Sequence, residues 1–388
     1  MKILYCINTI GVIGGTERVT IVKANALADI DGIEVGICFT DKGEYPRTVH
    51  PLSPKVKIFD LGTPYWELNS LWKVATGYIR KVYDGHRALR RVIDNFRPDI
   101  LVTTGGNERH FVTLTSRKVA YPTIFGDYRL RKIREFHFAS TYELLEATGP
   151  ASWIKARTNR MIQKHLVSRL FDKTYLLTRR DLDTNFKGCP RYDCMPNPST
   201  YPPVDRMPDS KEHVVLAIGR ISYQKNFESL IRVWSAIEPQ AHGWTLKILG
   251  GPDQASRELH EYARTKGCRH VECPGWSDNI PAELSKASIL CMTSRFEGMP
   301  LVLLEAMNAG VAPITFDYEF GPSDIITDGV NGILVTNGDE NEMSAKLLDL
   351  IKNNDRRHSI GTAAMKRIKD FSAPSIARRW IEKFNSLS

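Results

Sequence analysis

The chain has 388 residues, of which 42% are hydrophobic and 25% are charged, as in an ordinary globular protein. This length suggests two or three domains, each able to bury its own core. Lysine and arginine number 53 against 44 acidic residues, so the formal net charge is +9. The surplus points to an anionic partner, which could be nucleic acid, an anionic membrane or an anionic substrate. No stretch approaches the roughly 18 consecutive apolar residues of a membrane-spanning helix.

Short apolar runs alternate with helical stretches along the first half of the chain. The apolar start, 1–13, lacks a small-residue cleavage pattern and is better explained by a buried first strand than by a signal peptide. The expected strands cover 2–7, 33–39, 56–61 and 100–103. Between them lie expected helices at 17–28 and 71–96, the second with Gly77 and Gly85 as candidate break points. This alternation predicts a parallel sheet with helices on both faces.

The same pattern restarts after a proline-rich segment, 194–203, which can continue neither a helix nor a central strand. Further strands are expected at 214–218, 245–249, 270–273, 289–292, 311–316 and 332–335. Helices are expected at 227–237, 253–264 and 301–308, and three more helical stretches close the chain. We therefore predict an α/β protein with two doubly wound, Rossmann-like domains and a cleft between them. The expected divisions are a first domain at 1–195, a linker at 196–205, a second domain at 206–372, and a final helix at 373–388 that crosses back to the first domain.

The segment 294–310 follows an expected strand and carries two carboxylates. A proline at the expected first turn of a helix places Glu297 in the loop at the strand's carboxyl end and Glu305 about two turns into the helix. The start of this helix offers the amides of Met299 and Leu301 to an anion such as a phosphate. Glu305 lies among apolar residues and needs a partner, which paired ribose hydroxyls would supply. The alternative is that Glu297 caps the helix and Glu305 is solvated.

A second segment, 214–226, holds two cations beyond the end of an expected buried strand. The strand ends at Gly219, and Arg220 and Lys225 follow in a loop before a helix that begins near Asn226. Two cations at the carboxyl edge of a parallel sheet suit a diphosphate. Taken alone, the loop could equally be solvated.

Together these segments resemble the retaining glycosyltransferases of family 4, which have the two-domain fold called GT-B. The matching motifs are the Glu-x7-Glu pair Glu297 and Glu305, the Gly-Arg-x4-Lys residues Gly219, Arg220 and Lys225, and the Gly-Gly-x-Glu residues Gly14, Gly15 and Glu17. The resemblance is strong over 200–388 and elsewhere covers only the first loop and the general architecture.

The resemblance implies that the second domain binds a nucleotide-diphosphate sugar, with a UDP-sugar as the favoured donor. Glu305 would hold the ribose hydroxyls. Arg220 and Lys225 would neutralise the diphosphate and stabilise it as the leaving group. Glu297 and the amides of Gly298, Met299 and Leu301 would contact the transferred sugar. Gly14 and Gly15 would let the backbone approach the donor phosphates. Gly275 and Trp276 would lie near the base.

No cofactor or metal is expected, because cations would stabilise the leaving group. Two Asp-x-Asp triplets, 29–31 and 181–183, fall at or within helical stretches and are attributed to chance. The cysteine pairs at 189/194 and 268/273 lack a nearby histidine that would complete a zinc pattern.

A histidine near the reacting sugar is expected in the first domain. His137, at the end of the alternating segment 132–138, is the candidate, and His110 is its rival. The retaining reaction of the family is usually pictured as front-face attack, in which the leaving phosphate takes the acceptor's proton. No enzymic base is then required.

Much of the positive charge lies in 117–180, where acidic residues are few. Within it, 153–171 is expected to form one amphipathic helix with a basic face. The apolar face would comprise Ile154, Ile162, Leu166 and Leu170. Either this helix packs on its domain with a solvated basic face, or the basic residues of 117–180, Lys132 and Arg134 among them, form a surface that meets anionic lipid headgroups or a lipid-diphosphate acceptor.

We therefore expect a retaining glycosyltransferase that moves a sugar from a nucleotide-diphosphate donor to a glycan or lipid-diphosphate-linked acceptor in surface polysaccharide biosynthesis. Reduced cysteines fit the cytoplasm, with a peripheral position on the inner face of the plasma membrane as an option. Alternatives are a nucleotide-sugar isomerase or epimerase of the same fold, and a transferase that acts on a soluble metabolite. A nucleic-acid partner is not expected, because the sequence shows no aromatic-basic platform or recognition module.

Overall fold

The chain forms two compact units. Unit 1 comprises residues 1–198 and 373–388, and unit 2 comprises residues 199–372. The computed structural model describes residues 1–11, 14–41, 51–63, 71–105, 109–115, 118–119, 128–208 and 210–387. The side chains at 71–79, 110–111, 118–119 and 128 lie outside that description. Each unit is built on a parallel sheet with helices, so the α/β class expected from the sequence is confirmed.

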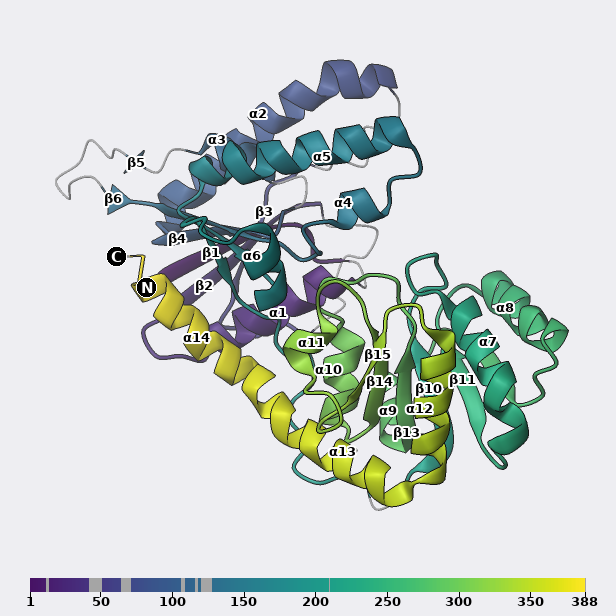
Figure 1. Ribbon diagram of the computed structural model, residues 1–388. Helices are drawn as coiled ribbons and strands as arrows, with labels where there is room; N and C mark the ends of the chain where they lie inside the picture. The colour runs from purple at the N-terminus through teal and green to yellow at the C-terminus, as the bar shows by residue number, and fades with distance from the viewer. Residues whose placement is uncertain are drawn as a thin grey trace. The chain divides into compact units, whose positions relative to one another are not determined.

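Unit 1 contains a seven-stranded parallel sheet in the order β3-β2-β1-β4-β7-β8-β9 (Figure 1). Its strands are β1 (Lys2–Thr9), β2 (Glu34–Asp41), β3 (Lys57–Asp60), β4 (Ile100–Thr103), β7 (Arg131–Glu135), β8 (Lys173–Leu176) and β9 (Tyr192–Cys194). Its helices are α1 (Gly15–Ala28), α2 (Leu71–Phe96), α3 (Arg109–Leu114), α4 (Tyr142–Leu145), α5 (Pro150–His165), α6 (Arg179–Asn185) and α14 (Ala373–Asn385). A separate antiparallel pair joins β5 (Lys118–Val119) to β6 (Tyr128–Arg129).

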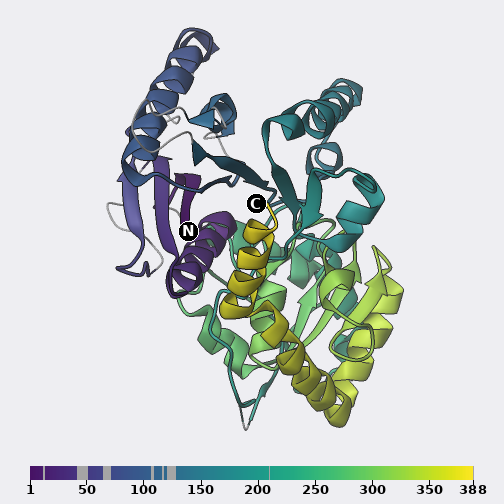
Figure 2. The same ribbon diagram turned by 90° about the vertical axis from the view of Figure 1, so that its left-hand side faces the viewer.

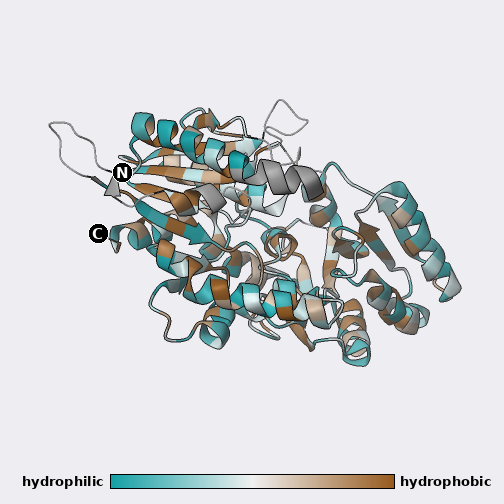
Figure 3. Ribbon diagram, turned by 90° about the horizontal axis from the view of Figure 1, so that it is seen from above, coloured by the Kyte–Doolittle hydropathy of each residue, from teal (hydrophilic) through white to brown (hydrophobic). Residues whose placement is uncertain are grey.

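Successive side chains of β1 enter two different cores. Ile3, Tyr5 and Ile7 pack with α1 and α14 on one face of the sheet. Leu4 and Cys6 pack with α2 on the other face. A strand that is apolar on both sides is what a parallel sheet between two helical layers requires, and Figure 3 shows the corresponding brown strands beneath helices with teal outer surfaces.

Three elements of unit 1 differ from the sequence-based expectation. The helix α2 is continuous, because a glycine inside a long helix costs only about 1 kcal/mol and neither Gly77 nor Gly85 ends it. The strand β7 stops at Glu135, which is the last residue in its ladder with β8. The expected helix at 153–171 is two pieces: α5 begins earlier, with Pro150 in its first turn, and a separate 3₁₀ turn covers Val167–Leu170.

The last helix, α14, belongs to unit 1 and lies beside α1 (Figure 1 and Figure 2). Its Trp380 is buried, with the ring centroid 4.7 Å from that of Tyr175 and 5.2 Å from that of Phe384. Lys383 Nζ donates to Asp193 Oδ2 at 2.6 Å. The C-terminal segment is therefore part of the core that supports β1 and β8.

Unit 2 contains a six-stranded parallel sheet in the order β12-β11-β10-β13-β14-β15. Its strands are β10 (Glu212–Ile218), β11 (Thr245–Leu249), β12 (Val271–Gly275), β13 (Ala287–Met292), β14 (Ala312–Asp317) and β15 (Ile333–Thr336). Its helices are α7 (Phe227–Ile237), α8 (Asp253–Thr265), α9 (Ile280–Lys286), α10 (Leu301–Asn308), α11 (Pro322–Ile325), α12 (Glu340–Lys352) and α13 (Asn354–Ile368). The central strands β10 and β13 carry the two loops that the sequence singled out.

Candidate functional site

Two loops at the carboxyl edge of the unit 2 sheet are joined by hydrogen bonds. The loop at 219–226 follows β10, and the loop at 293–300 follows β13, its parallel neighbour. The backbone N–H of Arg295 donates to the carbonyl oxygen of Gln224 at 2.8 Å, and its guanidinium donates to Asn226 Oδ1 at 2.8 Å. The structure therefore brings together the two segments that the sequence assigned to one site.

Glu297 and Lys225 form an ion pair across these loops. Lys225 Nζ donates to Glu297 Oε1 at 2.5 Å, and the two side chains are 17% and 12% exposed. Ser294 Oγ donates to the same oxygen at 2.9 Å, and Gln224 Nε2 donates to Oε2 at 3.0 Å. The alternative that Glu297 caps α10 is wrong, because within the described structure its carboxylate accepts from these three side chains, and the residue before the helix, Pro300, has no capping group. The N–H of Leu303 donates to the carbonyl oxygen of Pro300 at 3.2 Å, whereas the N–H groups before it are placed to bind an anion at the start of the helix.

Arg220 extends the positive charge of the same loop. It directly follows Gly219 at the end of β10, and its side chain is exposed. Within the described residues no partner is found for its guanidinium. Because a guanidinium has five N–H donors in a fixed plane, this side chain is suited to bind phosphate oxygens at the sheet edge.

Glycines end three neighbouring strands of this sheet and let their backbones approach closely. Gly250, with φ 132°, follows β11, and a Cβ there would lie 1.9 Å from the carbonyl oxygen of Gly219. Its N–H donates to the carbonyl oxygen of Gly275, the last residue of β12, at 2.7 Å. Trp276 follows and is 62% exposed. Sequence reasoning missed Gly250 and Gly251, although the Gly-Gly pair stands directly after the expected strand at 245–249.

Glu305 is buried on α10 and has a partner within the protein. Its side chain is 4% exposed, and Thr200 Oγ1 donates to its Oε1. The alternative of a solvated Glu305 is therefore wrong, because residues 302–308 of α10 are all buried. Thr200 comes from the proline-rich segment, 105 residues away, so the burial of this carboxylate does not by itself require a ligand.

The start of α1 provides a second helix N-terminus, at the carboxyl edge of the unit 1 sheet. Gly14 precedes the helix and has no side chain that could cap it, and Gly15 is the first residue of the helix. A Cβ on Gly14 would lie 1.9 Å from Glu17 Oε2, so the carboxyl group lies directly over the glycine. Burial raises the pKa of Glu17.

His137 lies in a buried ionic cluster two residues beyond β7. Its Nε2 is 3.1 Å from Glu135 Oε2, which also pairs with Lys23 Nζ, and the three side chains are at most 4% exposed. Burial, together with the charge of Lys23, lowers the pKa of His137, so its ring is neutral at pH 7. Burial would raise the pKa of Glu135, but Lys23 and His137 hold it well below the usual value. Since the Glu135 carboxylate only accepts, Nε2 of His137 carries the proton and Nδ1 is an acceptor with no hydrogen-bond partner in the described structure.

The rival histidine, His110, lies in α3, but its side chain is outside the described residues. Its place relative to the cluster around His137 therefore stays a prediction.

Two cations that the sequence counted toward a basic surface lie inside unit 1. Lys132 Nζ donates to three backbone carbonyl groups at and just beyond the end of α3, at 2.7 to 3.1 Å. Arg134 donates to Gln163 Oε1 and lies over the ring of Phe136, 4.2 Å from its centroid. Both residues belong to β7, which has strands on both sides, so they bond to the protein interior and contribute nothing to a surface.

The helix α5 and the following turn present apolar side chains to solvent. The exposed set comprises Trp153, Ile154, Met161, Ile162, Leu166 and Leu170. Of the helix itself only Ala156 is buried. Lys155, Arg157 and Arg169 are exposed beside this set. The alternative of a helix packed on its domain through its apolar face is therefore wrong, and the exposed face is of the kind that marks an interaction surface.

Among the described His, Cys, Asp and Glu side chains, no group of three or more is placed to hold a metal ion. The triplet at 181–183 lies on α6, where Asp181 is buried and accepts from Ser140 and Asn185. Across the described ranges no helix is both long and apolar enough to cross a membrane.

Known proteins resemble both units. Residues 205–367 match the family model described as Glycosyl transferases group 1. The chain is 32% identical over 175 residues to the amylovoran biosynthesis glycosyltransferase AmsD of Erwinia amylovora, which covers 45% of this chain and 49% of that protein. The match therefore spans about half the length of this relative.

Two other matches span nearly the whole chain. One is the GalNAc-alpha-(1->4)-GalNAc-alpha-(1->3)-diNAcBac-PP-undecaprenol alpha-1,4-N-acetyl-D-galactosaminyltransferase of Campylobacter jejuni, 24% identical over 388 residues and 98% of both chains. The other is the crystal structure of S. aureus TarM, as a G117R mutant in complex with Fondaparinux, alpha-GlcNAc-glycerol and UDP. It has a TM-score of 0.78 at 16% identity and covers 99% of both chains. At this identity the likeness to TarM shows the fold.

Proposed function

We propose that the chain is a retaining glycosyltransferase of family 4, because residues 205–367 match the family model described as Glycosyl transferases group 1 and the chain has the GT-B fold. It moves a sugar from a UDP-sugar to a glycan or lipid-diphosphate-linked acceptor in the assembly of a bacterial surface polysaccharide. The Campylobacter relative, which aligns over 98% of both chains, is named for a PP-undecaprenol-linked glycan and supports this acceptor class. The TarM complex with UDP supports the donor class.

The observation that carries the proposal is the pair of joined loops in unit 2. Arg220 and Lys225 neutralise the donor diphosphate and stabilise it as the leaving group. Lys225 also holds Glu297, through the 2.5 Å ion pair, where that carboxylate can accept from hydroxyls of the transferred sugar. The amides at the start of α10, where Pro300 offers no capping side chain, add donors for the same ligand.

The nucleoside end of the donor lies toward Glu305 and β12. Glu305 accepts from the ribose hydroxyls while it keeps its hydrogen bond from Thr200, since a carboxylate has about four acceptor positions. Trp276, exposed directly after β12, stacks on the base. A charged carboxylate with a hydroxyl pair gives a stronger hydrogen bond than a neutral group would.

For unit 1 the resemblance to the family carries the proposal: Gly14 and Gly15, at the start of α1, bind the donor phosphates, and His137 binds the reacting sugar. The neutral ring of His137 can accept a hydroxyl proton at Nδ1, while Glu135 and Lys23 fix its orientation. The reaction is front-face displacement: the bond from the anomeric carbon to the phosphate oxygen breaks as the acceptor oxygen bonds to the same face. The departing phosphate takes the acceptor's proton, so neither a metal ion nor an enzymic base is required.

The test is a thermal-shift panel of UDP-, GDP- and ADP-sugars, followed by product analysis with a lipid-diphosphate-linked glycan. We expect a UDP-sugar to raise the melting temperature most and its sugar to appear on the glycan. Stabilisation by none of the three nucleotide classes would remove the donor site. Conversion of the donor to an epimer without transfer would favour an isomerase of the same fold, and transfer only to a soluble metabolite would remove the lipid-linked acceptor.

We further propose that α5 and the following turn bind an anionic membrane surface. An ordinary surface helix buries its apolar face, whereas here the apolar residues around Met161 and Leu166 are 58% and 59% exposed. Trp153 suits the headgroup level of a bilayer, and Lys155 and Arg157 next to it each add about 1 kcal/mol of attraction to anionic lipid. An exposed apolar stripe beside cations is suited to the interface of an anionic membrane, where the apolar side chains leave water and the cations meet the headgroups.

Vesicle co-sedimentation tests the membrane proposal. The double variant Met161→Ser/Leu166→Ser should bind vesicles of equal parts anionic and neutral lipid at least about tenfold more weakly than the wild type. The matched control Ile58→Ser/Val330→Ser also removes two exposed apolar side chains, 47% and 55% exposed, but from β3 and unit 2, and should bind like the wild type. Equal binding by both variants, or wild-type self-association in place of vesicle binding, would remove the proposal.

A further inference from the structure

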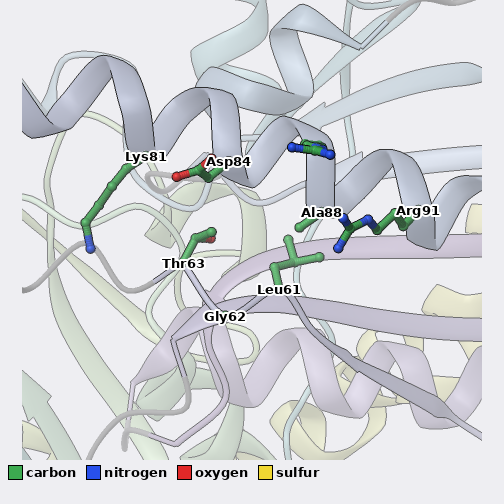
Figure 4. A pocket seen from close by; sticks show the side chains of 8 residues that line it. Leu61, Gly62, Thr63, Lys81, Asp84, Ala88 and Arg91 are labelled. Atoms are coloured by element: carbon green, nitrogen blue, oxygen red, sulfur yellow. The ribbon is translucent and has the colours of Figure 1, made fainter.

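A cavity of about 430 Å³ lies in unit 1, between α2 and the loop at 61–63 that follows β3 (Figure 4). Residues at positions 81, 84, 88 and 91 of α2 line it, and their spacing of three or four places them on one face of the helix. All of these residues belong to unit 1, and none takes part in the donor site in unit 2.

The cavity wall carries a surplus of positive charge. Its charged side chains are Lys81, Arg87 and Arg91 against Asp84 alone. In the described part of the chain Arg87 and Arg91 have no ion-pair or hydrogen-bond partner for their side chains. The cavity therefore holds two guanidinium groups whose donors are available to an anion.

Thr63 and Gly62, two uncharged residues of the loop at 61–63, also line the cavity. Thr63 is 8% exposed, and its buried Oγ1 has no hydrogen-bond partner in the described structure. Gly62 has φ +60°, and among the described residues other than its two chain neighbours no atom lies within 4 Å of the position that a Cβ would take there. The two guanidinium groups that line the cavity match the tetrahedral oxygens of a phosphate, and the Thr63 hydroxyl behind the wall has no competing partner in the described structure.

We propose that this cavity binds a phosphate or diphosphate group, and that in the transfer reaction this group is the diphosphate of the lipid-linked acceptor. The second half of the statement rests on the proposed function, whereas the anion site itself does not. The loop at 61–63 lies at the carboxyl edge of β3, four strand positions from β7, which leads to His137. At about 4.8 Å per strand, the two ends are about 19 Å apart. The start of α1, proposed above for the donor phosphates, follows β1, which is two strand positions or about 10 Å from β3. We assign the phosphate in the cavity to the carrier side of the acceptor, separate from the phosphate that leaves the donor.

Titration calorimetry with inorganic pyrophosphate tests the anion site, with UDP present at saturation to fill the donor site. The variant Arg87→Gln/Arg91→Gln should bind pyrophosphate at least about tenfold more weakly than the wild type. The matched control Arg80→Gln/Arg90→Gln removes the same charge from the same helix. Its arginines pair with Asp84 at 3.8 Å and Asp94 at 2.9 Å and do not line the cavity. The control should stay within about twofold of the wild type.

Several results would overturn the inference. Absence of pyrophosphate binding in the wild type would remove the site. Equal weakening in both double variants would reduce it to diffuse charge on α2. Loss of binding to plain anionic vesicles, with pyrophosphate affinity unchanged, would assign the arginines to lipid headgroups.

Acceptor kinetics test the second half of the proposal. Arg87→Gln/Arg91→Gln should raise KM at least about tenfold for the lipid-diphosphate-linked glycan and leave KM unchanged for the same glycan without diphosphate. An equal rise for both acceptors would overturn it. The two proposals can fail separately. If UDP does not bind but pyrophosphate binding still depends on Arg87 and Arg91, only the proposed function is contradicted. If UDP binds but pyrophosphate does not bind in the cavity, only the anion site is contradicted.

Discussion

Replacement of Lys225 by alanine tests the donor site through a single charge. Lys225 Nζ lies 2.5 Å from Glu297 Oε1, and its side chain is 17% exposed. A charge-assisted hydrogen bond to a phosphate contributes about 1.5 to 3 kcal/mol, so its loss should weaken UDP binding about tenfold to one hundredfold. Titration calorimetry with UDP measures this change directly.

Stability has to be separated from binding, because the substitution also breaks an ion pair. Unit 2 offers a matched pair in Lys247 and Glu283, which are 2.7 Å apart and 23% and 25% exposed. Lys247 lies within β11, away from the loop at 219–226. Each alanine variant should lose about 1 to 2 kcal/mol of unfolding free energy, between the values typical of exposed and of buried pairs.

The reasoning therefore requires two variants of similar stability and different UDP affinity. Lys225→Ala should lose UDP binding, and Lys247→Ala should bind UDP like the wild type. Wild-type UDP affinity in Lys225→Ala would refute the assignment of this lysine to the diphosphate. An equal loss in both variants would show that the effect comes from destabilised folding.

Three further predictions follow from single side chains. Glu305→Gln keeps an acceptor for Thr200 but removes the charge, so UDP affinity should fall about tenfold with little change in melting temperature; unchanged affinity would contradict the ribose assignment. Because the pKa of His137 is lowered below 6.5 on folding, the unfolded state binds more protons, and stability should fall as pH drops through 6.5. Urea unfolding at about pH 7.5 and about pH 5.5 should show a smaller fall for His137→Gln than for the wild type, and an equal fall would be contrary to this account. Trp380→Ala should cost about 3 to 5 kcal/mol in unit 1, measured by urea unfolding, and a cost below about 1 kcal/mol would show that α14 is not part of that core.

The architecture was predictable because it depends on local patterns. Apolar runs bounded by glycine and proline marked the strands of both parallel sheets, and strand alternation with helices implied their parallel direction. The motif loops at 219–226 and 293–300 could be placed at one sheet edge because each follows a buried strand. Details such as the continuity of α2 across Gly77 and Gly85 were harder, since tertiary packing can outweigh a small helix penalty.

Contacts between residues far apart in the chain were not predictable. Thr200 meets Glu305 across 105 residues, and Lys23 meets Glu135 across 112, and neither pairing has a local signal. Lys132 was counted as a surface cation because a sequence shows charge but not the direction of a side chain on a central strand. The sequence left open whether the apolar face of the helix at 153–171 packs on the protein, because amphipathicity shows two faces but not which one meets the protein.

The most direct test of the central claim is the anomeric configuration of the product formed from a UDP-sugar and a lipid-diphosphate-linked glycan in the presence of a metal chelator. Nuclear magnetic resonance of the new linkage gives this configuration. The account predicts transfer with the same configuration as in the donor, lost in Lys225→Ala and kept in Lys247→Ala. A product of inverted configuration, or transfer that stops when the chelator is added, would contradict it.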